Sequence, residues 1–227
     1  MSQILRLLNA SAEVSEVDLL LMAEAIQTQL ARDLGPAWGL LAPEVVSGDD
    51  GQADSDWVMT LSDATDPGVL GYHTDLGVPN SVICMGEILG YGGSVLQNAG
   101  VNPSVSSVVS HEAMEMTVDP LATMWEPRDD GTFVALEVAD PAQGWYYNVG
   151  DVAVADFVTP PWFLASSLAR GAKVDFLGLS AGGGKVSPEG YIVVKAADGS
   201  TSSVFGEATT GLWVKRARLQ KKRPVSA

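Results

Sequence analysis

The residues of this chain best suited to chemistry lie together in one short stretch. Residues 110–120 read SHEAMEMTVDP and contain His111, Glu112 and Glu115. Residues i and i+4 of an α-helix lie on the same face, so His111 and Glu115 can both reach one metal ion. The pattern H-E-x-x-E differs by one ligand from H-E-x-x-H, in which two imidazoles hold zinc and the glutamate between them is the general base. The stretch therefore predicts a zinc site with Glu112 as its catalytic base.

The glutamate at position 115 changes the expected chemistry. A carboxylate brings a negative charge where an imidazole would be neutral, so it weakens the pull of the ion on its other ligands. Catalytic zinc sites accept a mixture of His and Glu when three protein ligands leave a fourth position open. The substitution therefore permits catalysis but predicts a weaker Lewis acid. The competing interpretation is a solvated charged face of an exposed helix.

The residues around the motif favour a buried helix. Asn102-Pro103 is a helix-start signal, and Asp119-Pro120 is a stop signal. Five apolar residues between them fall at positions that would face a core: Val105, Val108, Val109, Ala113 and Met116. A buried charge without a partner costs several kcal/mol. The motif side chains therefore need either a metal ion or hydrogen bonds.

Four segments together resemble a family of phage and bacterial proteins that look like zincin metallopeptidases with an H-E-x-x-E helix. They are SHEAMEMTVDP, GVLGYHTDLGVPNSVICM at residues 68–85, LEVADP at residues 136–141 and VADFVTPPWF at residues 154–163. The resemblance implies a zincin-like α+β fold, and it names a fold more securely than an activity. In such folds the strand upstream of the motif helix lies at the sheet edge and pairs with an extended peptide substrate. The candidates for that strand are residues 69–73 and 81–85.

The third metal ligand is expected to be Glu137. It lies in the LEVADP string, where the resemblance places a third carboxylate. Asp140, in the same string, is expected to orient His111 or to act as a ligand itself. His73 and Asp119 are further alternatives for the third ligand. For Asp119 a role in the turn after the helix is favoured over ligation, because Pro120 biases it away from helical geometry.

Two tyrosines follow the expected third ligand. Tyr146 and Tyr147 lie in the sequence QGWYYNVGD. A tyrosine hydroxyl beside the metal can stabilise an oxyanion, whereas two adjacent aromatic residues more often pack at a strand edge. Packing is therefore the favoured role.

Composition is consistent with a compact chain and restricts other sites. The 227 residues are 46% hydrophobic, enough to bury a sizeable core. The single cysteine, Cys84, excludes an intramolecular disulfide and a four-cysteine zinc site, and its apolar setting predicts a buried thiol. Neither a signal peptide nor a membrane-spanning segment is predicted.

Charge is distributed unevenly along the chain. Six of the 13 lysines and arginines lie between Lys215 and Arg223, after all 28 acidic residues, so the first 214 residues carry 7 − 28 = −21. Such a body repels nucleic acid and anionic membranes, so no specific nucleic-acid binding is expected. The basic tail is expected either to contact an acidic patch on its own body or on a neighbouring subunit, or to be a solvated terminus.

Sequence patterns also predict the main elements. A helix is expected over residues 16–34, capped by Ser11 or Ser15 and stopped at Gly35-Pro36. Further strands are expected at residues 38–46, 57–61, 132–138 and 152–158, followed by a short helix near 163–168. Residues 191–195 and 202–205 are expected to form a hairpin.

These elements predict an α+β fold in three parts. Residues 1–175 form a zincin-like domain with an N-terminal helix, a mixed sheet and the motif helix. Residues 176–214 form a C-terminal β-hairpin extension, and residues 215–227 form the basic tail.

Two functions follow as expectations. The first is a zinc-dependent metallopeptidase, carried in a phage virion, in which His111, Glu115 and Glu137 hold zinc and Glu112 activates water. The second is a non-catalytic capsid, neck or tail protein built on the same scaffold. Both place the protein in the virion after synthesis in the host cytoplasm, with other virion proteins or its own subunits as partners.

Overall fold

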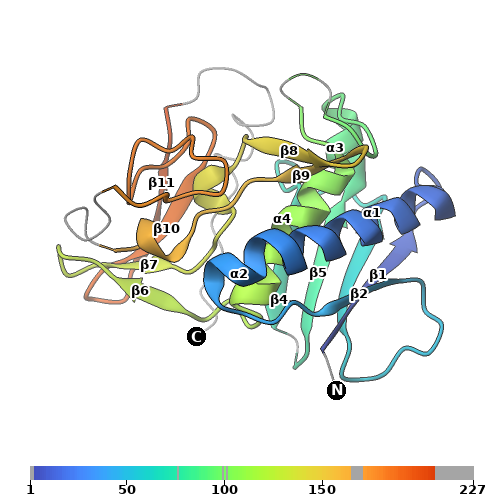
Figure 1. Cartoon of the computed structure of the whole chain (residues 1–227), viewed down its shortest axis with the longest axis horizontal. Coiled ribbons are helices and arrows are strands. Elements are labelled where there is room, and N and C mark those ends of the chain that lie inside the picture. The colour runs from blue at the N-terminus through green and yellow to red at the C-terminus, as the bar shows by residue number, and fades with distance from the viewer. Residues whose placement is uncertain (1–2, 76, 99, 101, 165–170, 208–227) are drawn as a thin grey trace.

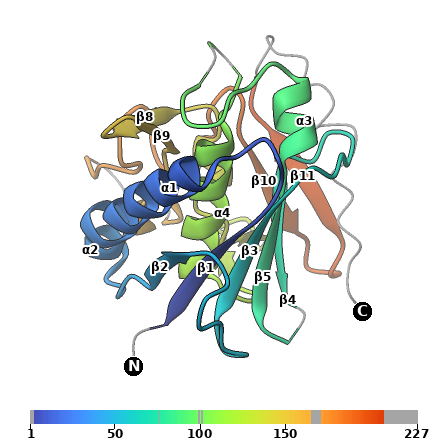
Figure 2. The same ribbon diagram turned by 90° about the vertical axis from the view of Figure 1, so that its right-hand side faces the viewer.

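The computed structural model describes residues 3–75, 77–98, 100, 102–164 and 171–207. It has a mixed α+β architecture, as the sequence predicts, with three sheets (Figure 1). The largest sheet has the strand order β2-β1-β3-β5-β4, the second has the order β11-β10-β7-β6, and β8 pairs with β9. Figure 2 shows α1 and α4 on the same face of the five-stranded sheet. Among the described residues, no helix is long and apolar enough to span a membrane.

The five-stranded sheet is parallel except at one edge. Its strands are β1 (Ile4–Ala10), β2 (Glu44–Ser47), β3 (Trp57–Ser62), β4 (Gly71–Asp75) and β5 (Pro79–Cys84). The edge strand β4 runs antiparallel to β5, in which Ser81 lies opposite His73. One of the two strands expected at the sheet edge, that of residues 69–73, therefore lies there. Cys84, at the end of β5, is buried as expected, and burial raises its pKa to about 11.

Strand β1 has no counterpart among the elements that the sequence predicts. It lies between β2 and β3 and pairs in parallel with both. Leu5 and Leu7 point into the core and are fully buried. Arg6 points to the other face, where it donates to Asp56 Oδ2 from Nε at 2.9 Å and from Nη2 at 2.8 Å. The alternation of leucine with a buried ion-paired arginine conceals the two-residue period of a strand.

The first helix is longer than predicted. Helix α1 (Glu16–Gln29) is capped by Ser15, whose side chain accepts a hydrogen bond from Asp18 N. The chain then continues through a π-helical turn, η1 (Leu30–Leu34), into α2 (Gly35–Trp38). The expected stop at Gly35-Pro36 was wrong, because Pro36 lies in the first turn of α2, where its missing amide is tolerated. The expected strand over residues 38–46 is correspondingly reduced to β2.

Helix α4 (Val105–Val118) is the motif helix, and it begins with a capping box between Ser104 and Ser107. Thirteen of its fourteen residues are buried, with only His111 partly exposed. The helix packs against β4 and β5 of the large sheet and against β9 of the small hairpin. A helix buried on this scale cannot be the exposed charged helix of the competing interpretation.

The remaining elements are short. They are α3 (Met85–Gly90), β6 (Trp125–Pro127), β7 (Phe133–Ala135), η2 (Asp140–Ala142), β8 (Tyr146–Val149), β9 (Val152–Ala155), η3 (Pro160–Trp162), β10 (Tyr191–Lys195) and β11 (Thr201–Phe205). Strand β10 pairs with β11 and also with β7, so Val194 lies opposite Val134. The boundary expected at residue 175 stays a prediction. Most of the short helix near residues 163–168, and all of the basic tail, lie outside the described residues.

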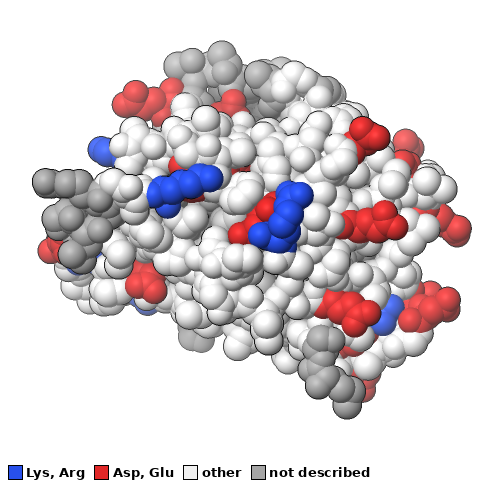
Figure 3. All heavy atoms as spheres, in the orientation of Figure 1, with Lys and Arg blue, Asp and Glu red and all other residues white. Residues whose placement is uncertain are grey.

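Charged side chains are spread over the surface of the described chain. Figure 3 shows acidic side chains scattered over one face and far fewer basic ones. The pairing expected between this surface and the tail involves residues that the structure does not describe.

Two buried carboxyl groups, Asp156 and Asp175, lie beyond the end of β9. Asp156 Oδ1 accepts hydrogen bonds from the backbone amides of Phe157 at 2.8 Å and Leu177 at 3.2 Å. Asp175 accepts two further backbone amides. Burial and the neighbouring charge of Asp175 raise the pKa of Asp156 to about 8, so Asp156 is largely protonated at neutral pH.

The buried cap of α4 yields a first prediction. Ser104→Ala should lower the free energy of unfolding by about 1 kcal/mol and the melting temperature by about 2–4 °C, because it removes the acceptor for Ser107 N. In the wild type this bond measures 3.1 Å. Urea denaturation should measure the loss. Ser15→Ala, which removes the same 3.1 Å bond to Asp18 N at an exposed cap, is the matched control. An equal or smaller loss in Ser104→Ala than in Ser15→Ala would contradict the importance of the buried cap.

The acidic pair yields a pH-dependent prediction. The unfolded chain releases the Asp156 proton near pH 4, whereas the folded chain holds it until about pH 8, so the free energy of unfolding falls as pH rises through this window. Asp156→Asn removes the proton-binding group and with it this pH dependence of the free energy of unfolding. The side-chain amide of the variant can donate to Asp175. Between about pH 5 and pH 8, the variant should gain on the order of 2 kcal/mol relative to the wild type.

Urea denaturation of both proteins at the two pH values tests this difference. The exposed Asp54→Asn is the control, and its difference from the wild type should stay constant. A constant difference for Asp156→Asn as well would show that Asp156 carries no proton in the folded chain.

Candidate metal centre

Helix α4 presents three ionisable side chains near the middle of the molecule. His111 and Glu115 lie one turn apart, and His111 Nε2 is 3.2 Å from Glu115 Oε1. Glu112 and Glu115 are buried, whereas the His111 side chain keeps 13% of its surface exposed. The helical spacing thus brings His111 and Glu115 together as the sequence predicts.

Asp140 completes a first group with His111 and Glu115. Its Oδ1 lies 3.2 Å from His111 Nε2, and the three residues each offer a ligand atom within 4.8 Å of the others. Asp140 opens the short helix η2, and its backbone amide donates to Glu115 Oε1 at 3.2 Å, as does that of Ala139 at 3.4 Å. The backbone of this turn therefore holds the Glu115 carboxylate in place.

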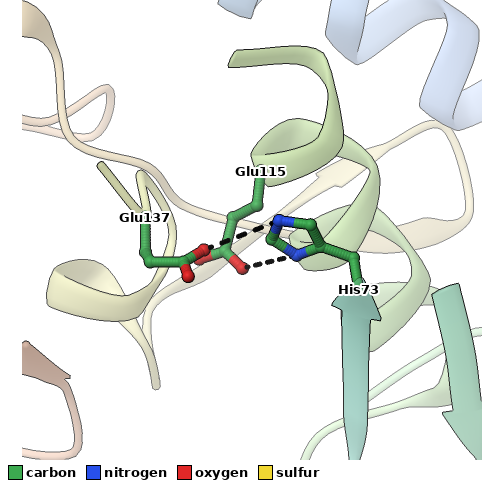
Figure 4. A group of neighbouring side chains, drawn as sticks. All are labelled: His73, Glu115 and Glu137. Carbon is green, nitrogen blue, oxygen red and sulfur yellow. Dashed lines mark ion pairs between the residues drawn. The ribbon is translucent and has the colours of Figure 1, made fainter. Parts of the chain in front are cut away.

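His73 and Glu137 form a second group with the same glutamate (Figure 4). His73 Nδ1 lies 3.7 Å from Glu115 Oε2, and His73 Nε2 lies 3.9 Å from Glu137 Oε2. The imidazole comes from β4, Glu115 from α4, and Glu137 from the loop after β7. All three side chains are buried, with exposures of 4% or less.

The structure divides the three expected ligands between these two groups. Glu115 belongs to both, His111 to the first and Glu137 to the second. Glu137 was expected on a strand, but β7 ends at Ala135 and leaves it in the following loop. Asp140 and His73, two of the alternatives for the third ligand, each lie in one group. Asp119 accepts the backbone amides of Thr123 and Met124 and so shapes the turn, as expected.

Glu112, the expected base, lies between the second group and a pocket. Its Oε2 is 3.3 Å from His73 Nδ1. Gly71 lies beside it on β4, where a Cβ atom would approach Glu112 Oε1 to 3.1 Å and Val108 Cγ1 to 3.0 Å. The absence of a side chain at Gly71 therefore makes room for Glu112. No short-range pattern in the sequence connects these two residues.

The pocket opens above His111 and Glu112. It is a small cavity of about 50 Å³ that is partly open to solvent. Its lining comprises Gly68, Leu70, Gly71, Pro103, Ser107, Val108, His111, Glu112, Gln143, Tyr146 and Ala155. The first group thus faces an accessible space through His111, while the second lies beneath it.

The two adjacent tyrosines have different surroundings. Tyr146 lines the pocket, and burial raises its pKa, so its hydroxyl stays protonated. Tyr147 donates to Asp33 Oδ2 at 2.8 Å and accepts from Gln29 Nε2 at 3.1 Å. Tyr147 therefore ties its hairpin to the end of the first helix, and Tyr146 is the one that lies beside the site.

A buried polar contact that the sequence did not predict fixes α4. Ser110 Oγ donates to Gln29 Oε1 at 2.7 Å and accepts Ala155 N at 3.0 Å. Gln29 Nε2 also donates to Ala155 O at 2.8 Å. These bonds join α1, α4 and β9 one residue before the motif begins, across 81 positions of sequence, a separation that no local pattern reveals.

The pKa values of the imidazoles reflect the excess of carboxylates. Burial opposes a charge on His73, but its hydrogen bond to Glu112 and the charges of Glu137, Glu112 and Glu115 outweigh burial and raise its pKa to about 9. Burial likewise opposes a charge on His111, where Glu115 and Asp140 outweigh it and raise the pKa. Both imidazoles therefore favour a bound proton, or another cation in its place.

The two glutamates of the helix respond in opposite directions. Burial would raise the pKa of Glu112, but its hydrogen bond to His73 and the charge of His111 lower it. Burial, with Asp140 and Glu137, raises the pKa of Glu115 to about 8 against the opposing effect of His111. Glu112 is thus ionised, as a general base must be, and Glu115 is the carboxylate most in need of a nearby positive charge.

Comparison with known proteins was made for the chain. No protein-family model, no curated protein and no solved structure matches it. The function must therefore be inferred from the geometry of the site together with the motifs of the sequence.

Proposed function

We propose that this protein is a zinc-dependent hydrolase in which His111, Glu115 and Asp140 hold the ion and Glu112 is the general base. One observation carries the proposal. These three ligand atoms lie within 4.8 Å of one another, and His111 lines a pocket that Glu112 also lines. Three protein ligands beside an accessible space are typical of catalytic zinc sites, which keep a fourth position open.

The spacing of the ligand atoms fits zinc. His111 Nε2 lies 3.2 Å from both Glu115 Oε1 and Asp140 Oδ1. Two ligands bound to one tetrahedral zinc at about 2.0–2.1 Å are separated by about 3.3 Å. The geometry favours Asp140 over Glu137 as the third ligand, because Glu137 lies in the buried second group.

The residues of the pocket have distinct roles in the proposed reaction. A zinc ion held here would supply Lewis-acid polarisation of a carbonyl group and of water. Glu112 takes a proton from the attacking water, and its ionised state at neutral pH suits that role. The protonated hydroxyl of Tyr146 lies on the pocket wall, where it can donate to an oxyanion.

We propose peptides as the substrate class. Strand β4 lies at the edge of the large sheet, and Leu70 and Gly71 line the pocket. An extended peptide paired along that edge would pass beside His111 and Glu112. An edge strand beside the motif helix is the arrangement that the zincin resemblance implies, so it supports both the fold and the substrate class.

A non-catalytic role is the alternative. Both imidazoles already lie within hydrogen-bonding distance of carboxylates, at 3.2 and 3.3 Å, and so can be satisfied as cations without a metal. On this alternative the motif is a polar core, and the protein serves as a structural component of a virion.

Metal analysis separates the two functions. The protein purified without chelators and supplied with zinc should retain zinc, and His111→Ala should lose the ion bound at the pocket, because it removes the only nitrogen ligand of the first group. Elemental analysis after gel filtration measures the content. Val108→Ala, which alters the pocket wall but no ligand atom, should retain the wild-type content. A wild type without zinc would favour the structural role.

Peptidase activity tests the assignment of the base. Glu112→Gln should lower the turnover of a quenched fluorescent peptide library by about 10²–10⁴-fold, because an amide cannot accept the proton of water. Zinc content should be unchanged. Glu126→Gln, outside the pocket on β6, is the control and should keep full activity. Loss of the ion bound at the pocket from Glu112→Gln would identify Glu112 as a ligand and contradict its role as base.

A further inference from the structure

The second group of ligands has a geometry that the proposed hydrolase does not use. The His73 side chain is fully buried, and Figure 4 shows it pointing between the carboxylates of Glu115 and Glu137. His73 Nε2 makes no hydrogen bond with any described residue. Its distance of 3.9 Å from Glu137 Oε2 is too long for a hydrogen bond but falls within the range for two ligands of a single ion, about 3.3 Å at tetrahedral angles and about 4 Å across an octahedron.

Glu112 fixes which nitrogen of His73 is available to a metal. His73 Nδ1 lies 3.3 Å from Glu112 Oε2, and donation of the Nδ1 proton to this ionised carboxylate leaves the lone pair on Nε2. Metal-binding histidines commonly donate their other ring N–H to a carboxylate in this way. The lone pair on Nε2 then faces Glu137 Oε2, and a proton or a metal ion between the two atoms would satisfy both.

Glu115 has two oxygens that face different groups. Oε1 lies 3.2 Å from His111 Nε2, and Oε2 lies 3.7 Å from His73 Nδ1. One carboxylate therefore extends an oxygen toward each group. Carboxylates in this position bridge the ions of two-metal sites, which lie about 3.5–4 Å apart.

The cluster is rich in buried carboxylates. Four of them, from Glu112, Glu115, Glu137 and Asp140, are each 5% exposed or less. Buried carboxylates at this density need positive charge nearby, and a divalent ion supplies it.

We propose that His73, Glu115 and Glu137 hold a second divalent cation, buried beneath the first, with the Glu115 carboxylate bridging the two ions. This inference rests on the proposed function in one respect, the shared ligand Glu115. One imidazole and two carboxylates suit zinc or manganese. The ion would join β4, α4 and the loop after β7, so it would stabilise the wall of the pocket rather than take part in the reaction.

Zinc stoichiometry tests the second site on the full-length protein. The chain stripped with a chelator and titrated with Zn²⁺ should bind two ions. His73→Gln and Glu137→Gln should each bind one, and so should His111→Gln, which removes the ligand of the pocket ion. Asp119→Asn is the matched control, because it alters a nearby buried carboxyl group that belongs to neither ligand group, and it should bind two.

The outcomes distinguish the second site from the proposed function. A single ion that persists in His73→Gln and Glu137→Gln would overturn the second site and leave the pocket site intact. Wild-type stoichiometry in His111→Gln would overturn the pocket site instead.

A measurement on the wild type alone avoids any dependence on the folding of variants. Two equivalents of Mn²⁺ bound on either side of one carboxylate should give an exchange-coupled electron paramagnetic resonance spectrum. The uncoupled spectrum of isolated ions at two equivalents would overturn the bridged pair.

Discussion

The structure depends on burying four carboxylates and two imidazoles around one helix. Helix α4 packs between the large sheet and the β8–β9 hairpin, so the polar face of its motif cannot reach bulk solvent except through His111. Glu115 lies at the centre, with His111 and the amides of Ala139 and Asp140 on one oxygen and His73 beside the other. Three distant segments, β4, α4 and residues 137–140, must therefore be placed correctly before this charge is stabilised, and the fold and the site depend on one another.

Local signals in the sequence predicted the helices that the site depends on. Ser15 and the apolar spacing after it predicted the start of α1, and the Asn102-Pro103 signal with five apolar positions predicted a buried α4. The i, i+4 relation of His111 and Glu115 followed directly, because helix geometry fixes it. The α+β class and the edge position of β4 are also as expected from the order of elements and the resemblance.

The features that the sequence did not predict are those set by tertiary context. The ion-paired Arg6 disguises β1, and a π-helical turn carries the first helix through Gly35-Pro36. The third ligand shows the same limitation within the site. Glu137 lies in the loop after β7, whereas Asp140 opens η2, and the end of β7 and the start of η2 decide which of them reaches His111. A strand continued through Glu137 would have oriented both residues differently, and spacing alone cannot reveal where the strand ends.

The glutamate at position 115 gives the cluster its distinctive chemistry. A histidine there would offer one lone pair to one ion, and the N–H of its other ring nitrogen would donate to a single acceptor. A carboxylate instead extends one oxygen to His111 and the η2 backbone and the other to His73. It also adds a buried negative charge, which favours a cation nearby. In the proposed metal centre, the departure from H-E-x-x-H would weaken the pocket ion as a Lewis acid, while the second carboxylate oxygen provides the geometry for the proposed second cation. A histidine at position 115 could not connect His73, on the edge strand, and Glu137 to the proposed pocket ligands in this way.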